Sequence, residues 1–571
     1  MRCAHHAGRR VDDSRMVDFS SPYLTEQLIA YIGNKRKLLP LVFRAIEKTG
    51  VGLEGVKFFD VFAGSGSVSR LVKSLGCEVF SNDWEYYSYI LNSAYVKIDK
   101  DEIPRLFGSE QRLERIIETI NNLPDPSESE RYIARYYAPK SFDNDAADFK
   151  TERLFYTKSN ALAIDKIRNH IERAYPKSAS PIEQKKRELL LAELLYEAAT
   201  HTNTSGVFKA FHKGFGGYSK DALARITSPI RLRFPVLASS PFPVHVYNED
   251  ANALVKKIGG IDIAYVDPPY NQHQYGSNYH LLNTIALWDC IPHPLDLNEK
   301  GELAEKAGIR HDWNRTRSDY CYKEKAERAF ADLLSNIDAK YILISYSTDG
   351  IIPFEAMRQL CMERGKVSIV TGEYTTYPGG KQSNARHNAN IEFVFCIDTA
   401  QKSDAASKRA IDDVLMKKKF ALLFKQKFSK EKLAAAAARF DGKRFAFAVR
   451  GKTVSLRTDG GFVLYPPENG RSLSVSDLRA LYDAIFPCAC KTKEDELTEL
   501  LSHIDGSEKS RAFISRIPGT LKKLAHRKNR ASFYAWLEKI KMLRETHPGL
   551  YARIDKKIAD VERLAELRFA T

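Results

Sequence analysis

Four consecutive residues, Asp267, Pro268, Pro269 and Tyr270, carry the most specific chemistry in the sequence. They directly follow an apolar run, and because two prolines remove two backbone N–H donors, the segment cannot continue as a central strand. The Asp267 carboxylate and the Pro268 carbonyl can together accept both hydrogens of an exocyclic amine. The Tyr270 ring can stack on a base that has been taken out of a duplex. The tetrapeptide therefore predicts a rigid platform that orients an amine for reaction, although a simple turn would explain it if it stood alone.

A glycine-containing loop and an acidic residue form a second candidate site. Phe62 ends an apolar run that leads into Gly64 and Gly66, which let the backbone turn tightly and approach a ligand closely. Ser69 occupies the position of the third glycine of a dinucleotide motif, which weakens that interpretation. Asp83 follows 17 residues after Gly66, at the end of the next apolar run. There a carboxylate can accept the hydroxyls of a ribose, and a helix N-cap is an equally good local interpretation.

A basic, aromatic segment precedes both sites in the chain. Residues 31–40 read YIGNKRKLLP, which places Tyr31, a glycine turn and three cations, among them Lys35, before an amphipathic helix. Taken alone, this segment is equally well explained as a basic N-terminal cap.

The elements that must position these residues are apolar runs that alternate with helical stretches. This alternation predicts an α/β fold with a mainly parallel sheet. Because open parallel sheets bind ligands at the carboxyl ends of their strands, we expect the polar residues that end these runs to share a site. The predicted strands are 56–62, 77–83, 243–250, 261–267, 341–347, 367–373 and 391–398.

The distance between the two candidate sites indicates an insertion. Gly66 and Asp267 are 201 residues apart, whereas two further strand–helix units need only about 60–70 residues. Residues 106–200 have mostly helical patterns. Residues 201–234 carry six Lys and Arg against one Asp, interleaved with aromatic side chains. That mixture suits contact with phosphates together with base-edge or intercalating contact.

Positive charge is concentrated at the end of the chain. Residues 1–400 carry 52 Lys and Arg against 51 Asp and Glu, whereas residues 401–571 carry 36 against 21. Nearly all of the net charge of +16 therefore lies in the last 171 residues. A segment that neutralises a polyanion has this balance, and so does a basic domain without such a partner. Within the segment, 444–466 resembles a hairpin and is followed by basic helical patterns, including 521–530.

The remaining features exclude several classes of protein. The length of 571 residues predicts two to four domains. No run of about 18 apolar residues occurs, so we expect no membrane span, and the N-terminus lacks the apolar region of a secretory signal. The eight cysteines are scattered, apart from Cys488 and Cys490. A single C-x-C pair lacks the second pair that a zinc site needs, so we expect reduced thiols and no metal site.

Taken together and in this order, the motifs Y-I-G-N-K, F-x-G-x-G, Asn-Asp and D-P-P-Y resemble the D12 class of adenine-specific DNA methyltransferases, the Dam-like alpha group. The resemblance covers roughly residues 20–400. It implies a methyltransferase with a Rossmann-like sheet and S-adenosylmethionine as the methyl donor. The implied cofactor-binding residues are Tyr31, Lys35, Phe62, Gly64, Gly66, Asp83, Asp267 and, more loosely, Asp250. The implied catalytic residues are Asp267, Pro268, Pro269 and Tyr270.

The same resemblance gives a domain plan. Residues 20–105 and 235–400 are expected to form the catalytic domain, and 106–234 an inserted helical target recognition domain with a DNA-contacting hairpin. The residues expected to contact DNA from that hairpin are Asn203, Lys209, His212, Lys213 and Tyr218. The compact members of the family have no counterpart of residues 401–571. For this basic α+β extension we expect a clamp on the DNA backbone, with a second base-reading module as the alternative.

The predicted function is site-specific methylation of adenine N6 in double-stranded DNA, either beside a cognate restriction endonuclease or as an orphan methylase. We expect a cytoplasmic, nucleoid-associated enzyme from a bacterium or phage, without a membrane partner. Transfer from a positively charged sulfonium neutralises charge, so neither a metal nor a covalent intermediate is required. Cytosine N4 methylation, methylation of glutamine or RNA, and a non-catalytic DNA-binding subunit remain as alternatives, and Asp267 at the first position of the motif favours adenine.

Overall fold

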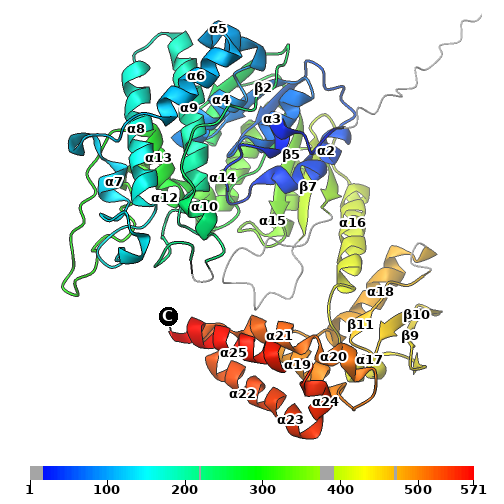
Figure 1. Ribbon diagram of the computed structural model, residues 1–571. Coiled ribbons are helices and arrows are strands. Elements are labelled where there is room, and N and C mark those ends of the chain that lie inside the picture. The colour runs from blue at the N-terminus through cyan, green and yellow to red at the C-terminus, as the bar shows by residue number, and fades with distance from the viewer. Residues whose placement is uncertain (1–16, 218–219, 373–390, 469–471, 571) are drawn as a thin grey trace, which may run out of the picture. The chain divides into compact units, whose positions relative to one another are not determined.

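The computed structural model describes residues 17–217, 220–372, 391–468 and 472–570 (Figure 1). The chain forms two compact units. Of the described residues, unit 1 contains 17–372 and 392–407, and unit 2 contains 391 and 408–570. The division therefore falls seven residues after the position expected from charge, within helix α16 (Ala405–Leu423).

Unit 1 is built on a seven-stranded sheet with the order β3-β2-β1-β4-β5-β7-β6. The first five strands in that order are parallel, and β7 runs antiparallel to both of its neighbours. The prediction of a mainly parallel sheet is thus confirmed, and each predicted strand is present with slightly different bounds. The strands are β1 (Lys57–Asp60), β2 (Glu78–Asn82), β3 (Val244–Tyr247), β4 (Ile261–Val266), β5 (Ala339–Ser347), β6 (Lys366–Thr371) and β7 (Glu392–Asp398).

Apolar side chains pack on both faces of this sheet, which explains why its strands are continuous apolar runs. On one face, α2 (Leu39–Glu47) and α3 (Ser67–Ser74) share a core with strand residues such as Phe58 and Ile263. On the other face, the Phe354 ring of α15 (Phe354–Arg364) packs against the rings of Phe393 and Phe395. Further helices of this unit are α1 (Pro22–Thr25), α11 (Ala251–Leu254), α12 (Tyr275–Asn278), α13 (His280–Leu287) and α14 (Lys323–Asn336).

The long connection from β2 to β3 is helical, as predicted. Its longest helix, α9, begins with a capping box of Ser180 and Glu183 and is buried along most of its remaining length. It shares one hydrophobic core with α4, α8 and α13, so residues 106–234 do not form a separate compact unit. The helices are α4 (Tyr86–Tyr95), α5 (Ile103–Phe107), α6 (Glu110–Asn121), α7 (Ile133–Tyr136), α8 (Lys158–Ala174), α9 (Pro181–Thr200) and α10 (Leu223–Thr227).

Unit 2 has two cores of its own. The first lies under an antiparallel sheet, β11-β10-β9-β8, and the predicted hairpin is its β9–β10 pair. A two-residue loop joins these strands, and both of its residues, Arg450 and Gly451, have positive φ, which matches the twist of a tight hairpin. The second core is formed mostly by helices, together with Phe462 from the segment between β10 and β11. The strands are β8 (Arg439–Phe440), β9 (Arg444–Val449), β10 (Lys452–Asp459) and β11 (Val463–Leu464).

The helices of unit 2 after α16 are α17 (Lys430–Ala436), α18 (Val475–Ile485), α19 (Lys493–Ser502), α20 (Ser510–Ile514), α21 (Ile517–Leu524), α22 (Arg530–Lys541), α23 (Leu543–Thr546), α24 (Pro548–Tyr551) and α25 (Asp555–Ala570). Among all the described helices of the chain, none is both long and apolar enough to cross a membrane.

Candidate active site

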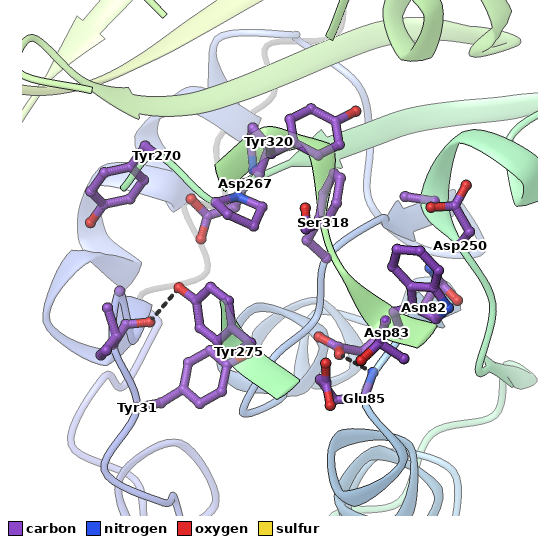
Figure 2. Close-up of a pocket in the computed structure, with 18 of the residues that line it drawn as sticks. Tyr31, Asn82, Asp83, Glu85, Asp250, Asp267, Tyr270, Tyr275, Ser318 and Tyr320 are labelled. Carbon is purple, nitrogen blue, oxygen red and sulfur yellow. Dashed lines mark hydrogen bonds between the residues drawn. The ribbon is translucent and has the colours of Figure 1, made fainter. Parts of the chain in front are cut away.

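A pocket lies at the carboxyl ends of the parallel strands, where the strand order reverses between β1 and β4. It encloses about 730 Å³, including its open mouth. Figure 2 shows Asp267 and Tyr270 at one end and Asp83, Glu85 and Asp250 at the other. Its lining residues are Tyr31, Ile32, Gly33, Phe62, Asn82, Asp83, Trp84, Glu85, Glu249, Asp250, Ala251, Asp267, Pro268, Pro269, Tyr270, Tyr275, Thr316, Ser318 and Tyr320.

The D-P-P-Y segment leaves the sheet as expected. Asp267 directly follows β4, and all four residues of the motif line the pocket. The Asp267 carboxylate forms an ion pair with Lys35, Oδ1 to Nζ 2.9 Å, and the two side chains are 14% and 5% exposed. Lys35 therefore fixes the position of Asp267.

Lys35 does not line the pocket, and its role in cofactor binding stays a prediction. Its ammonium donates to the Gly33 carbonyl at 3.1 Å and lies 5.3 Å from the centre of the Tyr270 ring. Burial opposes its charge, but Asp267 and, to a smaller extent, Tyr270, Tyr265 and Glu392 together outweigh burial and raise the pKa of Lys35 well above its ordinary value. Burial raises the pKa of Asp267, and the Lys35 charge opposes that shift. Lys35 belongs geometrically to the D-P-P-Y end as a fixed positive charge.

The two glycines of the loop after β1 lie behind the pocket wall, whereas Phe62 is part of it. Gly64 and Gly66 have φ of +52° and +78°. A Cβ at Gly64 would lie 2.8 Å from the Tyr31 ring, and one at Gly66 would lie 2.7 Å from the Asn92 amide oxygen. Only glycine fits these positions without displacement, because both the backbone angle and the space exclude a side chain. The loop is therefore packed tightly between the N-terminal segment and α4.

Asp83 is held by the backbone on both of its oxygens. Oδ2 accepts the N–H of Gly64 at 2.8 Å, and Oδ1 accepts that of Glu85 at 2.9 Å. Glu85, and not Asp83, occupies the N-cap position of α4. Burial raises the pKa of Asp83 to about 6 despite these hydrogen bonds. Each oxygen keeps a further acceptor position, so the carboxylate can still bind hydroxyl groups in the pocket.

Glu85 is a second buried carboxylate in the pocket that sequence reasoning missed. Its Oε2 accepts a hydrogen bond of 2.6 Å from the Asn283 side chain, and burial raises its pKa to about 7. Its place two residues after Asp83, at the same strand end, was the available signal. Asp250, in contrast, lies where expected: it lines the pocket, and its Oδ1 caps α11 by accepting the N–H of Ala253 at 2.9 Å.

An aromatic stack attaches the N-terminal segment to the pocket. The Tyr31 ring stacks on those of Tyr275 and Tyr279, at centroid distances of 5.1 and 5.0 Å. The Tyr275 hydroxyl donates to the Ile32 carbonyl at 3.0 Å, the bond drawn in Figure 2. Burial raises the pKa of Tyr31 well above its usual range, so the ring acts as a neutral apolar wall. Tyr275 and Tyr279 lie just after D-P-P-Y, which links the first and last motifs of the site.

A segment of residues 311–322, here called the strap, supplies three further pocket residues, Thr316, Ser318 and Tyr320. The Gln274 side chain accepts the Ser318 N–H at 2.9 Å and donates to the Ser318 carbonyl at 3.0 Å. The Tyr320 hydroxyl donates to the Asn252 side chain at 2.8 Å. These bonds hold the strap against the segments that follow β3 and β4.

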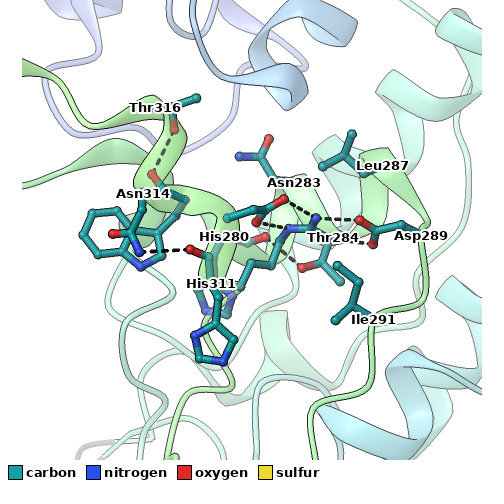
Figure 3. A network of polar contacts seen from close by, with 12 residues as sticks. His280, Asn283, Thr284, Leu287, Asp289, Ile291, His311, Asn314 and Thr316 are labelled. Carbon is teal, nitrogen blue, oxygen red and sulfur yellow. Dashed lines mark hydrogen bonds and ion pairs between the residues drawn. The ribbon is translucent and has the colours of Figure 1, made fainter.

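Arg310 anchors the start of the strap through ion pairs with Asp289 and Asp312. Figure 3 shows the polar network around Asp289 and the strap residues His311, Asn314 and Thr316. The Arg310 guanidinium is only 2% exposed and donates to both oxygens of Asp289, at 2.7 and 2.6 Å, and of Asp312, at 3.0 and 2.6 Å. Such bidentate pairs fix orientation as well as position. The strap therefore has a defined place over the pocket.

The segment expected to form a DNA-contacting hairpin does not have hairpin structure in its described part. No strand occurs in its described part, residues 201–217. Asn203 is fully buried: its side chain donates to the Leu154 carbonyl at 3.0 Å and accepts the Gly216 N–H at 3.2 Å. The family resemblance implied a hairpin here, but the aromatic rings of Phe208 and Phe215 are buried in hydrophobic cores. These rings are not available for intercalation.

The other residues expected to contact DNA are placed differently. Lys209 and Lys213 are exposed, and His212 is half-buried. Tyr218 lies outside the described residues. No group of three or more His, Cys, Asp or Glu side chains that could hold a metal ion occurs in the part of the chain that the structure describes.

A parallel sheet with a glycine loop after β1, carboxylates after β2 and a proline-rich amine platform after β4 defines a methyltransferase of the doubly wound α/β class. The comparison with known families agrees over residues 31–359. The chain belongs to the D12 class N6 adenine-specific DNA methyltransferases. The predicted family, activity and adenine specificity are thereby confirmed.

Similar characterised proteins include the type II methyltransferase M.NlaIII of Neisseria lactamica, 34% identical over 64% of this chain and 97% of that protein. Modification methylase LlaI of Lactococcus lactis subsp. lactis is 32% identical over 62% of this chain and 52% of its own length. The type II methyltransferase M.FokI of Planomicrobium okeanokoites is 32% identical over 67% and 55%. The chain thus spans nearly all of the first relative and about half of the other two, and about a third of it lies outside each match.

Proposed function

We propose that the pocket binds S-adenosylmethionine and that the D-P-P-Y platform presents the N6 amine of a flipped adenine to its methyl group. The observation that carries this proposal is the single pocket that joins the carboxylates after β2 to Asp267 after β4. Such an arrangement puts the two reacting partners at opposite ends of one cavity, with their reactive groups facing each other.

The residues present fit S-adenosylmethionine. The Asp83 carboxylate can accept the ribose hydroxyls, and Phe62, Trp84 and Tyr31 offer aromatic surface to the adenine and the methionine chain. The negative charges of Asp83 and Glu85 complement the positive charge of the ligand.

At the other end, the chain orients the amine. Asp267 and the Pro268 carbonyl accept its two hydrogens, which directs the nitrogen lone pair toward the pocket. The Lys35 charge favours the ionised form of Asp267 and orients its carboxylate, and Tyr270 stacks on the flipped base. The cofactor supplies a methyl group on a positively charged sulfur. The proton lost from the nitrogen goes to solvent or through Asp267.

The test separates cofactor binding from DNA binding. Asp83→Ala should weaken S-adenosylmethionine binding about 10- to 100-fold, the value of a hydrogen bond to a charged group, with unchanged affinity for duplex DNA. Asp262→Ala, at the opposite end of β4, is the control and should bind the cofactor normally. Calorimetry and fluorescence anisotropy measure the two affinities. Unchanged cofactor affinity, or an equal loss of DNA affinity, would remove Asp83 from the proposed site.

We also propose that residues 106–234 recognise the target sequence, with Lys209 and Lys213 at the DNA. These lysines are exposed in a loop whose fold Asn203 fixes. The variant Lys209→Gln/Lys213→Gln should raise the KM for DNA without changing that for the cofactor. A normal KM for DNA would place the contact elsewhere in the segment.

The relatives named type II methyltransferases or modification methylases support a role in restriction–modification. We propose that this enzyme protects DNA against a restriction endonuclease of the same sequence specificity, in the compartment that holds the genome. DNA methylated by the purified enzyme should resist cleavage by an endonuclease that recognises the methylated sequence. Digestion of that DNA to nucleosides should yield N6-methyladenine. Full sensitivity to every endonuclease that cuts at the methylated sequence would oppose this role.

For unit 2 we propose binding to the DNA phosphate backbone, because it carries most of the excess positive charge. Its removal should weaken binding to specific and random duplexes equally and leave the methylated sequence unchanged. M.NlaIII, which the match covers over 97% of its length, indicates that family members without such an extension exist. A changed recognition sequence would instead indicate base reading by unit 2.

A further inference from the structure

The positive charge of unit 2 is unevenly distributed. Residues 509–537 contain eight Lys and Arg and no Asp or Glu. Five of these cations, Lys522, Lys523, Arg527, Lys528 and Arg530, fall within nine residues. We call these five residues the basic junction, because they lie where α21 ends and α22 begins.

Packing of the two helices directs the basic junction outward. Leu521, Leu524 and Ala525 are buried in the helical core, and so are Phe533 and Leu537 on α22. All five cations between these anchors are exposed. A short 3-10 turn, Arg527–Asn529, joins the helices and presents two of the five. The core contacts therefore fix a short, rigid surface with five positive side chains.

The cations of the β9–β10 hairpin are arranged differently. Arg444 and Arg457 lie 3.7 and 3.6 Å from Glu468, and Arg450 and Lys452 lie 3.8 and 2.7 Å from Asp477. Two carboxylates therefore pair with these four cations and offset about half of their charge within the protein.

No member of the basic junction forms an ion pair with any residue in the described part of the chain. The N-cap residue of α22, Asn529, makes no side-chain hydrogen bond to the first turn of the helix. Its side chain therefore does not compete with a ligand for the N–H groups of that turn. Positive side chains together with such N–H groups suit phosphate oxygens. A cation without a partner can neutralise a phosphate at no cost to the protein, whereas a paired one must first give up its carboxylate.

We infer that the basic junction is the surface with which unit 2 binds the phosphate backbone of duplex DNA. This inference rests on the proposed DNA-binding role of unit 2 and assigns that role to five residues at one helix junction, instead of to the hairpin or to net charge. Duplex DNA is the polyanion that the family acts on. Contacts to phosphate add affinity without sequence information.

Two variants of the full-length chain, equal in net charge, test the assignment. The first is Lys522→Gln/Lys523→Gln/Arg527→Gln/Lys528→Gln. The control neutralises four exposed cations that have carboxylate partners elsewhere in unit 2: Arg444→Gln/Arg457→Gln/Arg511→Gln/Arg563→Gln. Fluorescence anisotropy with a random-sequence duplex over a range of salt concentrations gives the slope of log K against log salt. Circular dichroism and cofactor affinity, which should be unchanged, verify the fold.

The junction variant should flatten the salt slope by about 3 to 4 units, at about 0.9 for each phosphate contact, and the control by less than about 1. Equal flattening by both variants would overturn the assignment and leave DNA binding by unit 2 as a net-charge effect.

A normal slope in the junction variant, with flattening only when unit 2 is removed, would overturn the assignment alone. A normal slope in both the junction variant and the protein without unit 2 would overturn the assignment together with the proposed role. If the junction variant methylated a different DNA sequence, the junction would read bases, and the assignment to phosphate contacts would be wrong. Tighter binding to a single-stranded RNA of equal length would point to a different polyanion and overturn it as well.

Discussion

The pocket of unit 1 and the basic junction of unit 2 use charge in opposite ways. Lys35 and Asp267 are buried at 2.9 Å from each other, and Arg310 is enclosed by two carboxylates. The five cations of the junction are exposed and form no ion pair with any described residue. A buried charge that loses its partner costs several kcal/mol, whereas solvent and salt screen each exposed charge. A single substitution in the pocket should therefore have a large effect. At the junction, the effect should depend on how many cations are removed.

The largest effect is expected for the buried pair. Asp267→Ala should lower methylation roughly 1,000-fold or more, because it removes the acceptor that orients the amine, and leave cofactor binding within a few-fold. It should also destabilise unit 1, since Lys35 stays buried without a partner. The double variant Asp267→Ala/Lys35→Met should recover stability but not activity. Near-normal turnover in either variant, measured with methyl-labelled cofactor, would contradict the role of Asp267.

A smaller effect is expected at the strap, where the ion pairs of Arg310 position the pocket residues but do not contact the ligand. Arg310→Met should raise the KM for S-adenosylmethionine about 10-fold with kcat nearly unchanged, because misplacement of about 1 Å is costly even far from the reacting atoms. Arg315→Gln, an exposed position of the same segment, is the matched control. A fall in kcat at constant KM would mean that the strap acts on the reaction itself.

The pH dependence of cofactor binding tests the two carboxylates after β2. Burial raises the pKa of Asp83 to about 6 and that of Glu85 to about 7. Both groups are therefore more fully ionised at pH 8 than at pH 6, and the affinity for a cationic ligand should fall several-fold as the pH drops from about 8 to about 6. In Asp83→Asn/Glu85→Gln the affinity should be lower and nearly independent of pH. A profile that keeps its slope in this variant would assign the titration to other groups.

The smallest effect is expected for one cation of the junction. Lys523→Gln should reduce the salt slope by about 0.9 and affinity at physiological salt only about 2- to 4-fold. Combining it with further substitutions at the junction should add nearly equal steps, because screened charges act independently. A single substitution that abolished DNA binding would show that the junction resembles the pocket after all.

Much of the catalytic frame could be predicted from the sequence because its signals are local. The strands are continuous apolar runs, and D-P-P-Y is distinctive by composition, so both were found with the correct order and position. Phe62, Asp83 and Asp250 also line the pocket as expected. The ion pair of Lys35 with Asp267 could not be predicted from the sequence, because it spans more than 200 residues.

The missed residues depend on contacts between distant segments. Thr316 and Ser318 belong to a polar segment without periodicity. Contacts of Arg310 and Gln274, and the hydrogen bond from Tyr320 to Asn252, bring it to the pocket. The error at Asn203 has a related cause. Its polar side chain was interpreted as a DNA contact, yet it satisfies buried backbone groups of its own loop. Sequence patterns report which faces are apolar but not which buried polar groups need a partner.

The pocket wall combines residues from Tyr31 to Tyr320, all within unit 1. A partly unfolded unit 1 therefore has no complete binding site, and a bound ligand stabilises the whole unit by mass action. At a ligand concentration of 100 times Kd this adds about 2.7 kcal/mol to the free energy of unfolding. Unit 2 has separate cores, and none of its described residues lines the pocket. Calorimetric unfolding should accordingly show two transitions, of which S-adenosylmethionine raises the temperature of one and leaves the other unchanged.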